Sequence, residues 1–355
     1  VVTVLTSRYS PALPAHETLG GVQVVRAPVV ARLSKGVLMP TLGLLATRLA
    51  ATHDAVSLHL PQFDASGIAL RGRLFRKPTV LTYHCDLLLP PSPLNGLINR
   101  IVYFSNQLAA TLADAIVAYT RDYAENSPLL SRYLSKVRVI PPPVEIAEVE
   151  AGAVAEFRAR HMLNGHRVIG MAARLAGEKG VEHLLDALPT ILDRHPETRV
   201  LFAGQYQNVL GEEKYARRLA PLFESYRDRW TFLGVLDAAQ MAAFFRALDV
   251  LVVPSTNSTE SFGLVQIESM LCGTPVVASN LPGVRQPVAM TGMGKVVPIA
   301  DPPALADAVS AVLADRDSFR QSPENIAATF SPEAVAGEYE RLFRELSRRK
   351  HWLYK

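Results

Sequence analysis

Two basic side chains follow an apolar run at 168–172, in a setting suited to binding an anion. Arg174 and Lys179 lie five residues apart, Gly177 and Gly180 stand beside them, and a helical pattern follows. Glycine lets the backbone approach a ligand, arginine can bind two phosphate oxygens together, and a helix N-terminus offers free N–H groups. We therefore predict a phosphate site here. The alternative is an ordinary turn whose charges are solvated.

A polar loop after the apolar run 250–253 predicts a second anion site. The loop ends in an aromatic residue and a glycine, and a helical pattern follows, so the first N–H groups of that helix are free to bind an anion. We expect the ligand-binding part of the site to consist of Ser261, Phe262, Gly263, Leu264 and Val265, with Gly177 of the first loop.

Two glutamates accompany this second loop. Glu268 lies four residues after Leu264, on the same helix face, where a carboxylate can accept hydrogen bonds from the two hydroxyls of a ribose. Glu260 lies in the loop and is free to reach another hydroxylated group. An anion site, a diol-binding carboxylate and a second carboxylate together predict a nucleotide-sugar site. The alternatives are a solvated helix residue for Glu268 and a carboxylate favoured by the helix dipole for Glu260.

These loops belong to a repeating pattern of strand and helix. Short apolar, β-branched runs predict buried strands, and amphipathic helical patterns lie between them, so we expect an α/β fold with parallel sheets covered on both faces. The runs in the first half are 1–6, 22–25, 55–58, 79–82, 115–118 and 137–140. Those in the second half are 168–172, 199–203, 230–233, 250–253 and 275–278.

A run of three prolines at 141–143 predicts the linker between two domains, because proline cannot continue the preceding strand. The charge balance changes there as well. Residues 1–143 carry a net charge of +7, residues 144–340 carry −8, and residues 341–355 carry +5. We therefore expect two doubly wound, Rossmann-like lobes, 1–143 and 144–340, facing a cleft. Ligands of such sheets bind beyond the carboxyl ends of the strands, where both loops lie.

Several other classes of protein are excluded by composition and motifs. The two cysteines lie in different halves, and neither is part of a CxxC pair, so a disulfide framework and structural zinc are not expected. No GxGxxG motif follows a strand, which argues against a nicotinamide enzyme. The Asp-x-Asp at 315–317 lies far from the glutamates, and we interpret it as solvated. We expect no metal and no cofactor.

The second half resembles the family-4 retaining glycosyltransferases of the GT-B fold. The resemblance rests on Arg174 with Lys179-Gly180, on Glu260-x-Phe262-Gly263 with Glu268, and on the segment 273–279. It implies that Arg174 and Lys179 bind the diphosphate of the donor, that Glu268 binds the ribose, and that Glu260 contacts the transferred sugar. It also implies that the tail 341–355 returns to the first lobe, which binds the acceptor.

The first half resembles the same family less extensively. The segment 82–86 resembles the histidine-containing loop of the family, which implies that His84 faces the donor sugar. A packed histidine at a strand end is the alternative, and we interpret His59 as structural. The segment 1–7 resembles the second strand of the family, so we expect that a strand–helix unit of about 30 residues is missing before it.

The predicted activity is metal-independent transfer of a hexose, of mannose or glucose type, from a nucleoside-diphosphate sugar to a hydroxyl acceptor. The acceptor would be lipid-linked or a polysaccharide. Arg174, Lys179, Glu260 and His84 are the predicted catalytic residues. Two alternatives remain. One is a nucleotide-sugar epimerase of the same architecture, and the other is an inactive nucleotide-binding scaffold.

The basic charge of the first lobe and the tail predicts a further partner. Arg71, Arg73 and Arg76 alternate with apolar residues, and Trp352 and Tyr354 accompany the cations of the tail. Lysine and arginine bind anionic lipid, and the two aromatic residues suit a membrane interface. We therefore predict a cytoplasmic protein that docks peripherally on the inner face of the plasma membrane. A solvated basic surface is the alternative, and nucleic acid is not expected because no recognition motif accompanies the charge.

Overall fold

The chain folds into two compact units in the computed structural model, which describes residues 1–33, 36–89 and 93–353. Unit 1 comprises Val1–Ala118, Pro128–Arg138 and Tyr339–Lys355, and unit 2 comprises Tyr119–Ser127 and Val139–Glu338. The sequence analysis put the boundary at 143, whereas unit 2 begins at Val139 and also takes in Tyr119–Ser127. Each unit has the α/β architecture that the strand and helix pattern predicts.

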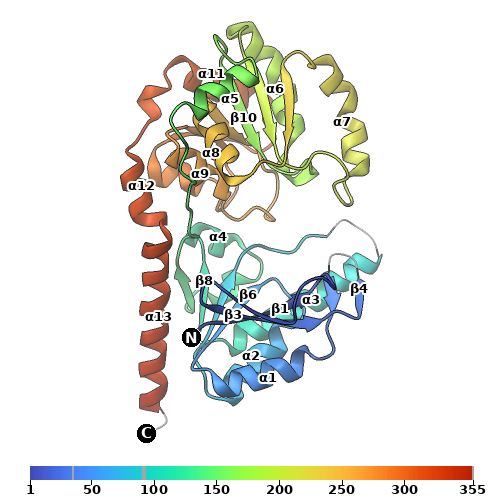
Figure 1. Cartoon of the computed structure of the whole chain (residues 1–355), viewed down its shortest axis with the longest axis vertical. Helices are drawn as coiled ribbons and strands as arrows, with labels where there is room; N and C mark the ends of the chain where they lie inside the picture. The colour runs from blue at the N-terminus through green and yellow to red at the C-terminus, as the bar shows by residue number, and fades with distance from the viewer. Residues whose placement is uncertain (34–35, 90–92, 354–355) are drawn as a thin grey trace. The chain divides into compact units, whose positions relative to one another are not determined.

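Unit 2 is built on one sheet of six parallel strands, in the order β12-β11-β10-β13-β14-β15 (Figure 1). This is the doubly wound order 3-2-1-4-5-6, in which ligands bind where the strand order reverses, here between β10 and β13. The strands are β10 (Val168–Ala172), β11 (Arg199–Ala203), β12 (Trp230–Gly234), β13 (Val250–Val253), β14 (Val276–Ser279) and β15 (Gly294–Val297).

Helices cover both faces of this sheet because successive strand residues point to opposite sides. On one face Ile169 and Met171 pack with α6 (Val181–Arg194), α7 (Glu213–Ser225) and α11 (Pro302–Ala314). On the other face Val168 packs with a second group of helices. These are α5 (Ala153–Arg160), α8 (Ala238–Ala247), α9 (Leu264–Leu271), α10 (Gln286–Thr291) and α12 (Pro323–Phe330). The segment Tyr119–Ser127 adds the short helix α4 (Arg121–Asn126) to this unit.

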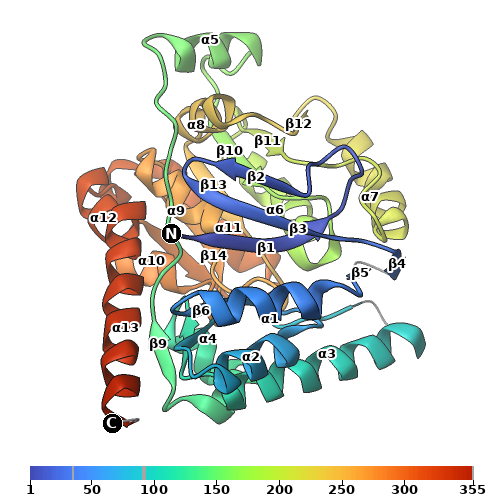
Figure 2. The ribbon, with the colours of Figure 1, turned by 60° about the horizontal axis from the view of Figure 1, so that its bottom comes forward.

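Unit 1 contains three separate sheets among its described residues. The largest has the order β6-β7-β8-β9, and its strands are β6 (Val56–Leu60), β7 (Thr79–Tyr83), β8 (Ala115–Ala118) and β9 (Val137–Val139). The second has the order β1-β3-β2, with strands β1 (Thr3–Arg8), β3 (Val22–Pro28) and β2 (His16–Leu19), and the third pairs β4 (Ala31–Leu33) with β5 (Gly36–Leu38). The helices of this part are α1 (Leu42–Thr52), α2 (Ala65–Leu74) and α3 (Pro93–Leu112) (Figure 2).

The last helix, α13 (Pro332–Leu353), contributes its residues from Tyr339 onward to unit 1. The Tyr339 hydroxyl shares a hydrogen bond of 3.0 Å with Thr82 Oγ1. Lys350 Nζ lies 2.8 Å from Asp114 Oδ2, and both side chains are more than four-fifths buried. The basic tail is therefore part of the fold of unit 1. Within the described ranges, no helix has the length and apolar character needed to span a membrane.

Candidate nucleotide-sugar site

The two predicted loops meet at the point where the strand order of unit 2 reverses. The loop after β10 and the loop after β13 are joined by a hydrogen bond of 3.0 Å, which Thr256 N–H donates to the Glu178 carbonyl. Gly180 has a φ of +65°, and a Cβ at this position would lie 2.1 Å from the Pro254 carbonyl oxygen. Because only glycine tolerates both the backbone angle and the contact, Gly180 allows the two loops to approach one another.

The closest pair in this site joins a residue of each loop. Lys179 Nζ donates a hydrogen bond to Glu260 Oε2, and their side chains are 23% and 18% exposed. The sequence analysis gave these residues separate roles, at the diphosphate and at the sugar. Their ion pair shows that the cation and the carboxylate lie side by side, and each charge stabilises the other.

The second predicted cation, Arg174, is more exposed. Its Nη2 lies 3.2 Å from Glu178 Oε1, and 52% of its side chain is exposed. A pair this open to solvent contributes little free energy, about 0–1 kcal/mol. Arg174 can therefore leave Glu178 for a phosphate at small cost.

Helix α7 supports the loop after β10 through two residues that the sequence analysis did not identify. Gly177 N–H donates to Glu212 Oε2 at 3.1 Å, and Val181 N–H donates to the Tyr215 hydroxyl at 3.1 Å. Burial and the neighbouring Glu182 raise the pKa of Tyr215. Glu212 and Tyr215 thus satisfy the N–H of Gly177, in the loop after β10, and the N–H of Val181, the first residue of α6. The Gly177 N–H, a predicted binding group, therefore already donates to a carboxylate of the same unit. Neither residue lies near a recognisable motif, so spacing could not identify them.

The loop after β13 is anchored by its aromatic residue. Phe262 is 1% exposed, and its ring packs against Tyr119 and Phe330, with ring centroids 6.0 Å and 5.9 Å away. The buried Gln266 amide donates to the Phe262 carbonyl at 2.9 Å and to the Val284 carbonyl at 2.8 Å. The ring of Phe262 therefore lies in the hydrophobic core of unit 2, so a binding role for this residue would have to come from its backbone.

Helix α9 begins directly after this anchor. Gly263 has a φ of +79° and forms the N-cap, and a Cβ there would lie 2.7 Å from Gln266 Nε2. The N–H groups of Leu264 and Val265 lie in the first turn, where an α-helix leaves them without an intrahelical partner. The side chain of Ser261 is nearly buried, whereas Leu264 is 43% exposed. The start of α9 therefore presents backbone donors to an anion.

Glu268 lies one turn further along α9 and is half-buried. Burial raises the pKa of its carboxyl, because the charged form loses solvent. Among the residues that the structure describes, none forms a hydrogen bond or an ion pair with this carboxylate. This position differs from that of a solvated helix residue. A half-buried carboxylate with free lone pairs is suited to accepting hydrogen bonds from a diol.

His84 follows β7 in unit 1 and forms a pair with His59, which lies in β6. His84 Nε2 lies 3.0 Å from His59 Nδ1, and the two rings are stacked with centroids 5.2 Å apart. Burial lowers the pKa of both histidines, and the charge of His59 lowers the pKa of His84 further. One ring nitrogen must donate and the other accept, so at least one of the two rings is neutral. His59 therefore positions His84, which spacing alone did not predict.

The sequence matches two family models, which together cover most of the chain. Residues 154–329 match the "Glycosyl transferases group 1" family, and residues 1–143 match the "Glycosyl transferase 4-like domain". Together with the six-stranded sheet and the loops at its switch point, these matches define a glycosyltransferase of the GT-B fold. The chain belongs to the family-4 glycosyltransferases.

Curated relatives are similar over part of their length. A D-inositol 3-phosphate glycosyltransferase of Corynebacterium jeikeium is 34% identical over 221 residues, which are 59% of this chain and 52% of that protein. A phosphatidyl-myo-inositol mannosyltransferase of Mycobacterium leprae is 40% identical over 136 residues, 38% of this chain and 34% of that protein. The chain thus spans about half, or less, of the length of these two relatives.

Solved structures share the fold over nearly the whole chain. Sucrose-phosphate synthase from Thermosynechococcus elongatus has a TM-score of 0.74 at 25% identity, covering 97% of this chain and 88% of that one. The Anabaena protein HepE in complex with UDP has a TM-score of 0.72 at 21% identity, covering 91% and 86%. The prediction of a GT-B fold with two Rossmann-like units is confirmed.

Proposed function

We propose that this chain transfers a hexose from a nucleoside-diphosphate sugar to a hydroxyl acceptor. The observation that carries the proposal is the Lys179–Glu260 ion pair, which joins the loop after β10 to the loop after β13 at the switch point of unit 2. Arg174 lies in the first of these loops, and the second leads into α9, which carries the half-buried Glu268. The names of the inositol-phosphate and phosphatidylinositol relatives support a phosphorylated polyol, or its lipid, as the acceptor.

In the proposed reaction the chain stabilises the departing diphosphate. Arg174, Lys179 and the first N–H groups of α9 supply positive charge where negative charge develops, so no metal is required at the leaving group. Lys179 exchanges the Glu260 carboxylate for a phosphate oxygen, and the freed Glu260 accepts hydrogen bonds from the sugar. Glu268 accepts hydrogen bonds from the ribose. The departing phosphate takes the proton of the acceptor hydroxyl on the same face, which retains the anomeric configuration.

A thermal-shift panel of UDP, GDP, ADP and their hexose conjugates tests the donor site directly. A ligand that binds the folded chain raises its melting temperature by mass action. We expect one base to be preferred, and we expect Glu268→Gln to abolish the shift. No shift with any nucleotide at millimolar concentration would contradict the proposal. An epimerase would convert the bound sugar nucleotide without an acceptor, whereas a transferase would release free sugar slowly.

We also propose that unit 1 docks on an anionic membrane through the end of α2. Leu70, Leu74 and Phe75 are 46%, 69% and 38% exposed, and Arg73 is exposed among them. An apolar patch with cations at its edge suits a lipid surface. Arg71, by contrast, donates hydrogen bonds of 2.7 Å to Thr47 Oγ1 and to the Gly67 carbonyl, so this side chain contributes to the fold.

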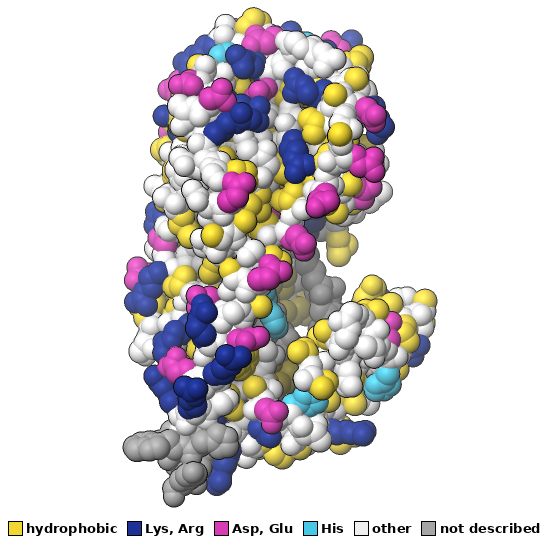
Figure 3. Space-filling model, turned by 60° about the vertical axis from the view of Figure 1, so that its left-hand side comes forward, with side chains coloured by type: hydrophobic (Ala, Val, Ile, Leu, Met, Phe, Trp, Pro, Cys, Tyr) yellow, Lys and Arg dark blue, Asp and Glu magenta, His cyan; other side chains and the backbone are white. Residues whose placement is uncertain are grey.

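Helix α13 supplies less free charge than the sequence analysis expected. Figure 3 shows Lys and Arg side chains gathered over α13 in the lower part of the view, with acidic side chains among them. Arg344 pairs with Glu340, and Arg349 with Glu345, at 2.9 Å and 2.6 Å. Tyr354 lies outside the described residues, and the structure gives no account of the Trp352 side chain. The membrane proposal therefore rests on α2.

A further inference from the structure

Five large apolar side chains of α3 point away from unit 1. They are Leu94, Leu97, Ile101, Phe104 and Leu108, and each is between 40% and 68% exposed. They form one stripe along the outer face of the helix, which runs beside α2 (Figure 2). A contiguous apolar surface left open to water is typical of a contact with a partner.

The side chains that α3 buries are, by contrast, mostly small or polar. They are Val102, Ser105, Asn106, Ala109 and Ala110. Ser105 Oγ donates a hydrogen bond of 2.6 Å to the Phe63 carbonyl, and Asn106 Oδ1 accepts one of 3.4 Å from Gln62 N–H. This inner face holds α3 in unit 1. The stripe on the outer face takes no part in that packing.

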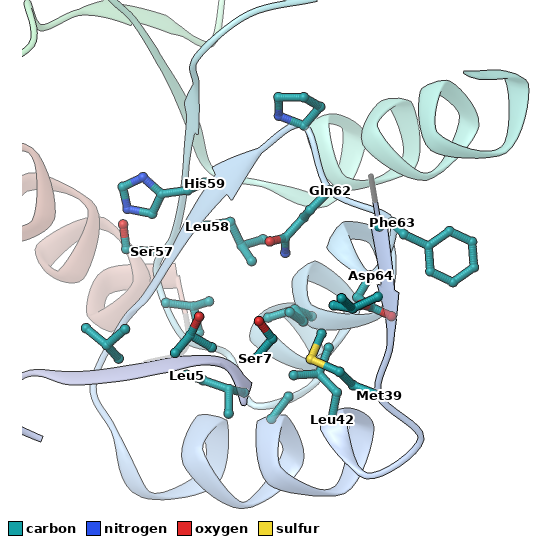
Figure 4. A pocket seen from close by; sticks show the side chains of 18 of the residues that line it. Leu5, Ser7, Met39, Leu42, Ser57, Leu58, His59, Gln62, Phe63 and Asp64 are labelled. Atoms are coloured by element: carbon teal, nitrogen blue, oxygen red, sulfur yellow. The ribbon is translucent and has the colours of Figure 1, made fainter. Parts of the chain in front are cut away.

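Phe63 extends the apolar surface beside the stripe. It is 52% exposed, and Figure 4 shows its ring pointing away from the other labelled side chains. Its carbonyl is bonded to Ser105, which follows Ile101 by one turn of α3, and Phe63 and Ile101 line the same groove. The exposed apolar surface is therefore wider than the helix alone.

The five residues of the stripe are spaced as in the seam of a coiled coil. Their successive separations are three, four, three and four residues, which is the a and d pattern of a heptad repeat. Such a seam is narrower than the apolar face of a helix that covers a core. The spacing therefore favours a second helix as the partner.

The charge of α3 argues against a lipid surface as the partner. Of its 20 residues only Arg100 is charged. Helices that lie on anionic membranes carry several lysines and arginines beside their apolar face. The end of α2, where Arg73 accompanies Leu74 and Phe75, is closer to that character than the stripe of α3.

A second copy of α3 offers a complementary stripe. In an antiparallel pair, the seam brings Leu97 of one copy against Leu108 of the other, and Ile101 against Phe104. The two Arg100 side chains are then separated along the axis of the pair, whereas a parallel pair holds these like charges at the same level. A symmetric pairing of this kind is complete with two copies.

We propose that the stripe of α3 is the contact surface of a homodimer, in which two copies of the chain pair in antiparallel order around a two-fold axis. The stripe is about 21 Å long, at about 1.5 Å per residue. A contact of this length is smaller than the roughly 800 Å² per partner of a standard interface, so we expect a dissociation constant of about 1–100 µM. This proposal does not depend on the activity of the donor site.

Sedimentation equilibrium tests the dimer. The chain has a mass of 38.7 kDa, and the average mass should rise toward twice that value as the concentration passes the dissociation constant. Ile101→Ser with Phe104→Ser should weaken the dimer by at least about tenfold. The matched control is Leu44→Ser, which removes a side chain of α1 that is 75% exposed and should leave the dissociation constant unchanged. A monomer at every concentration up to about 200 µM, or equal weakening by the control, would overturn the proposal.

Disulfide cross-linking tests the order of the two helices. A mixture of Leu97→Cys chains with Leu108→Cys chains should cross-link on mild oxidation, because the antiparallel seam brings these positions together. Neither variant alone should cross-link, since like positions lie about 16 Å apart along the axis. The parent chain, with its partly buried Cys85 and Cys272, gives the background. No cross-link in the mixture, or equal cross-linking of one variant alone, would overturn the proposed pairing.

Vesicle binding separates a second copy from a lipid surface as the partner of the stripe. At a protein concentration below the dissociation constant, Ile101→Ser with Phe104→Ser should sediment with phosphatidylglycerol vesicles as the parent does. Leu74→Ser with Phe75→Ser, at the end of α2, should still dimerise. Loss of vesicle binding in the α3 variant, with a parent that stays monomeric, would assign the stripe to lipid and overturn the proposal.

Discussion

The pairing of Lys179 with Glu260 gives a prediction in which stability and turnover separate. In Lys179→Met, Glu260 keeps a carboxylate that is 18% exposed and has lost its cation. Breaking a fully buried pair costs about 3–5 kcal/mol, and since about a fifth of each side chain is exposed, we expect about 1–3 kcal/mol here. For a unit of this size, at about 2–4 °C per kcal/mol, that corresponds to a melting temperature lower by about 2–12 °C.

The kcat of Lys179→Met should fall by more than the loss of folded protein can explain. Loss of one donor that stabilises a developing anion costs about 10²–10³ in kcat. The double variant Lys179→Met with Glu260→Gln should recover most of the melting temperature, since the unpaired charge is gone, and should remain inactive. Calorimetric melting and release of nucleoside diphosphate from the preferred donor measure the two effects.

Arg174→Met is the matched control. Its ion pair with Glu178 is half-exposed, so the melting temperature should stay within about 1 °C while turnover falls. Turnover within threefold of the parent in Lys179→Met would refute the assignment of this cation to the diphosphate. A double variant that melts no higher than Lys179→Met would refute the claim that an unpaired Glu260 causes the loss of stability.

Five further predictions concern pH, metal ions and membrane binding. Burial raises the pKa of the Glu268 carboxyl, so ionisation of this group opposes folding at neutral pH. Glu268→Gln should therefore raise the melting temperature at neutral pH. Melting curves at several pH values should show this gain in stability disappear as the pH falls below the pKa of Glu268. In the parent, calorimetry should show nucleotide affinity falling as pH drops through the same pKa, because a protonated carboxyl accepts fewer hydrogen bonds. His59→Ala should raise the pKa of His84, because it removes a nearby charge and admits solvent. The acid limb of the pH–rate profile should then move to higher pH. If the acid limb does not move, His59 contributes only to packing. Saturating EDTA should leave turnover unchanged, and loss of turnover with rescue by Mg²⁺ would reveal a metal site. The chain should sediment with anionic vesicles at low salt and be released as the salt concentration rises. The double variant Leu74→Ser with Phe75→Ser should no longer bind these vesicles. Equal sedimentation with neutral vesicles would contradict the electrostatic part of the proposal.

The strands whose bounds could be predicted most closely from the sequence are buried on both faces. The runs at 168–172, 199–203 and 250–253 match β10, β11 and β13 residue for residue, because a strand covered on both sides is apolar without interruption. The prediction missed β2, β4, β5 and β15. Most of their described residues are exposed or partly exposed, so these short strands carry no periodic apolar signal.

The site was predictable where residue type decides its chemistry and not where packing decides it. The Lys179–Glu260 pair joins residues 81 positions apart, and only the adjacency of β10 and β13 brings them together. Phe262 stands among ligand-binding residues in the sequence, yet an apolar ring gains more free energy from the core than from a polar loop. The hydrogen bond between Tyr215 and the first residue of α6 depends on how α7 packs, and no sequence motif predicts that packing.

The discontinuous composition of the units has a consequence for synthesis on the ribosome. Unit 1 lacks its last piece until Tyr339 and the residues after it have been made, about 200 residues after Arg138. At roughly 5–20 residues per second, this delay lasts about 10–40 s. During that time neither Thr82 nor Asp114 has its partner from α13. Unit 2 acquires Tyr119–Ser127 early and can be completed first, so the part of the chain that is translated first should finish folding last.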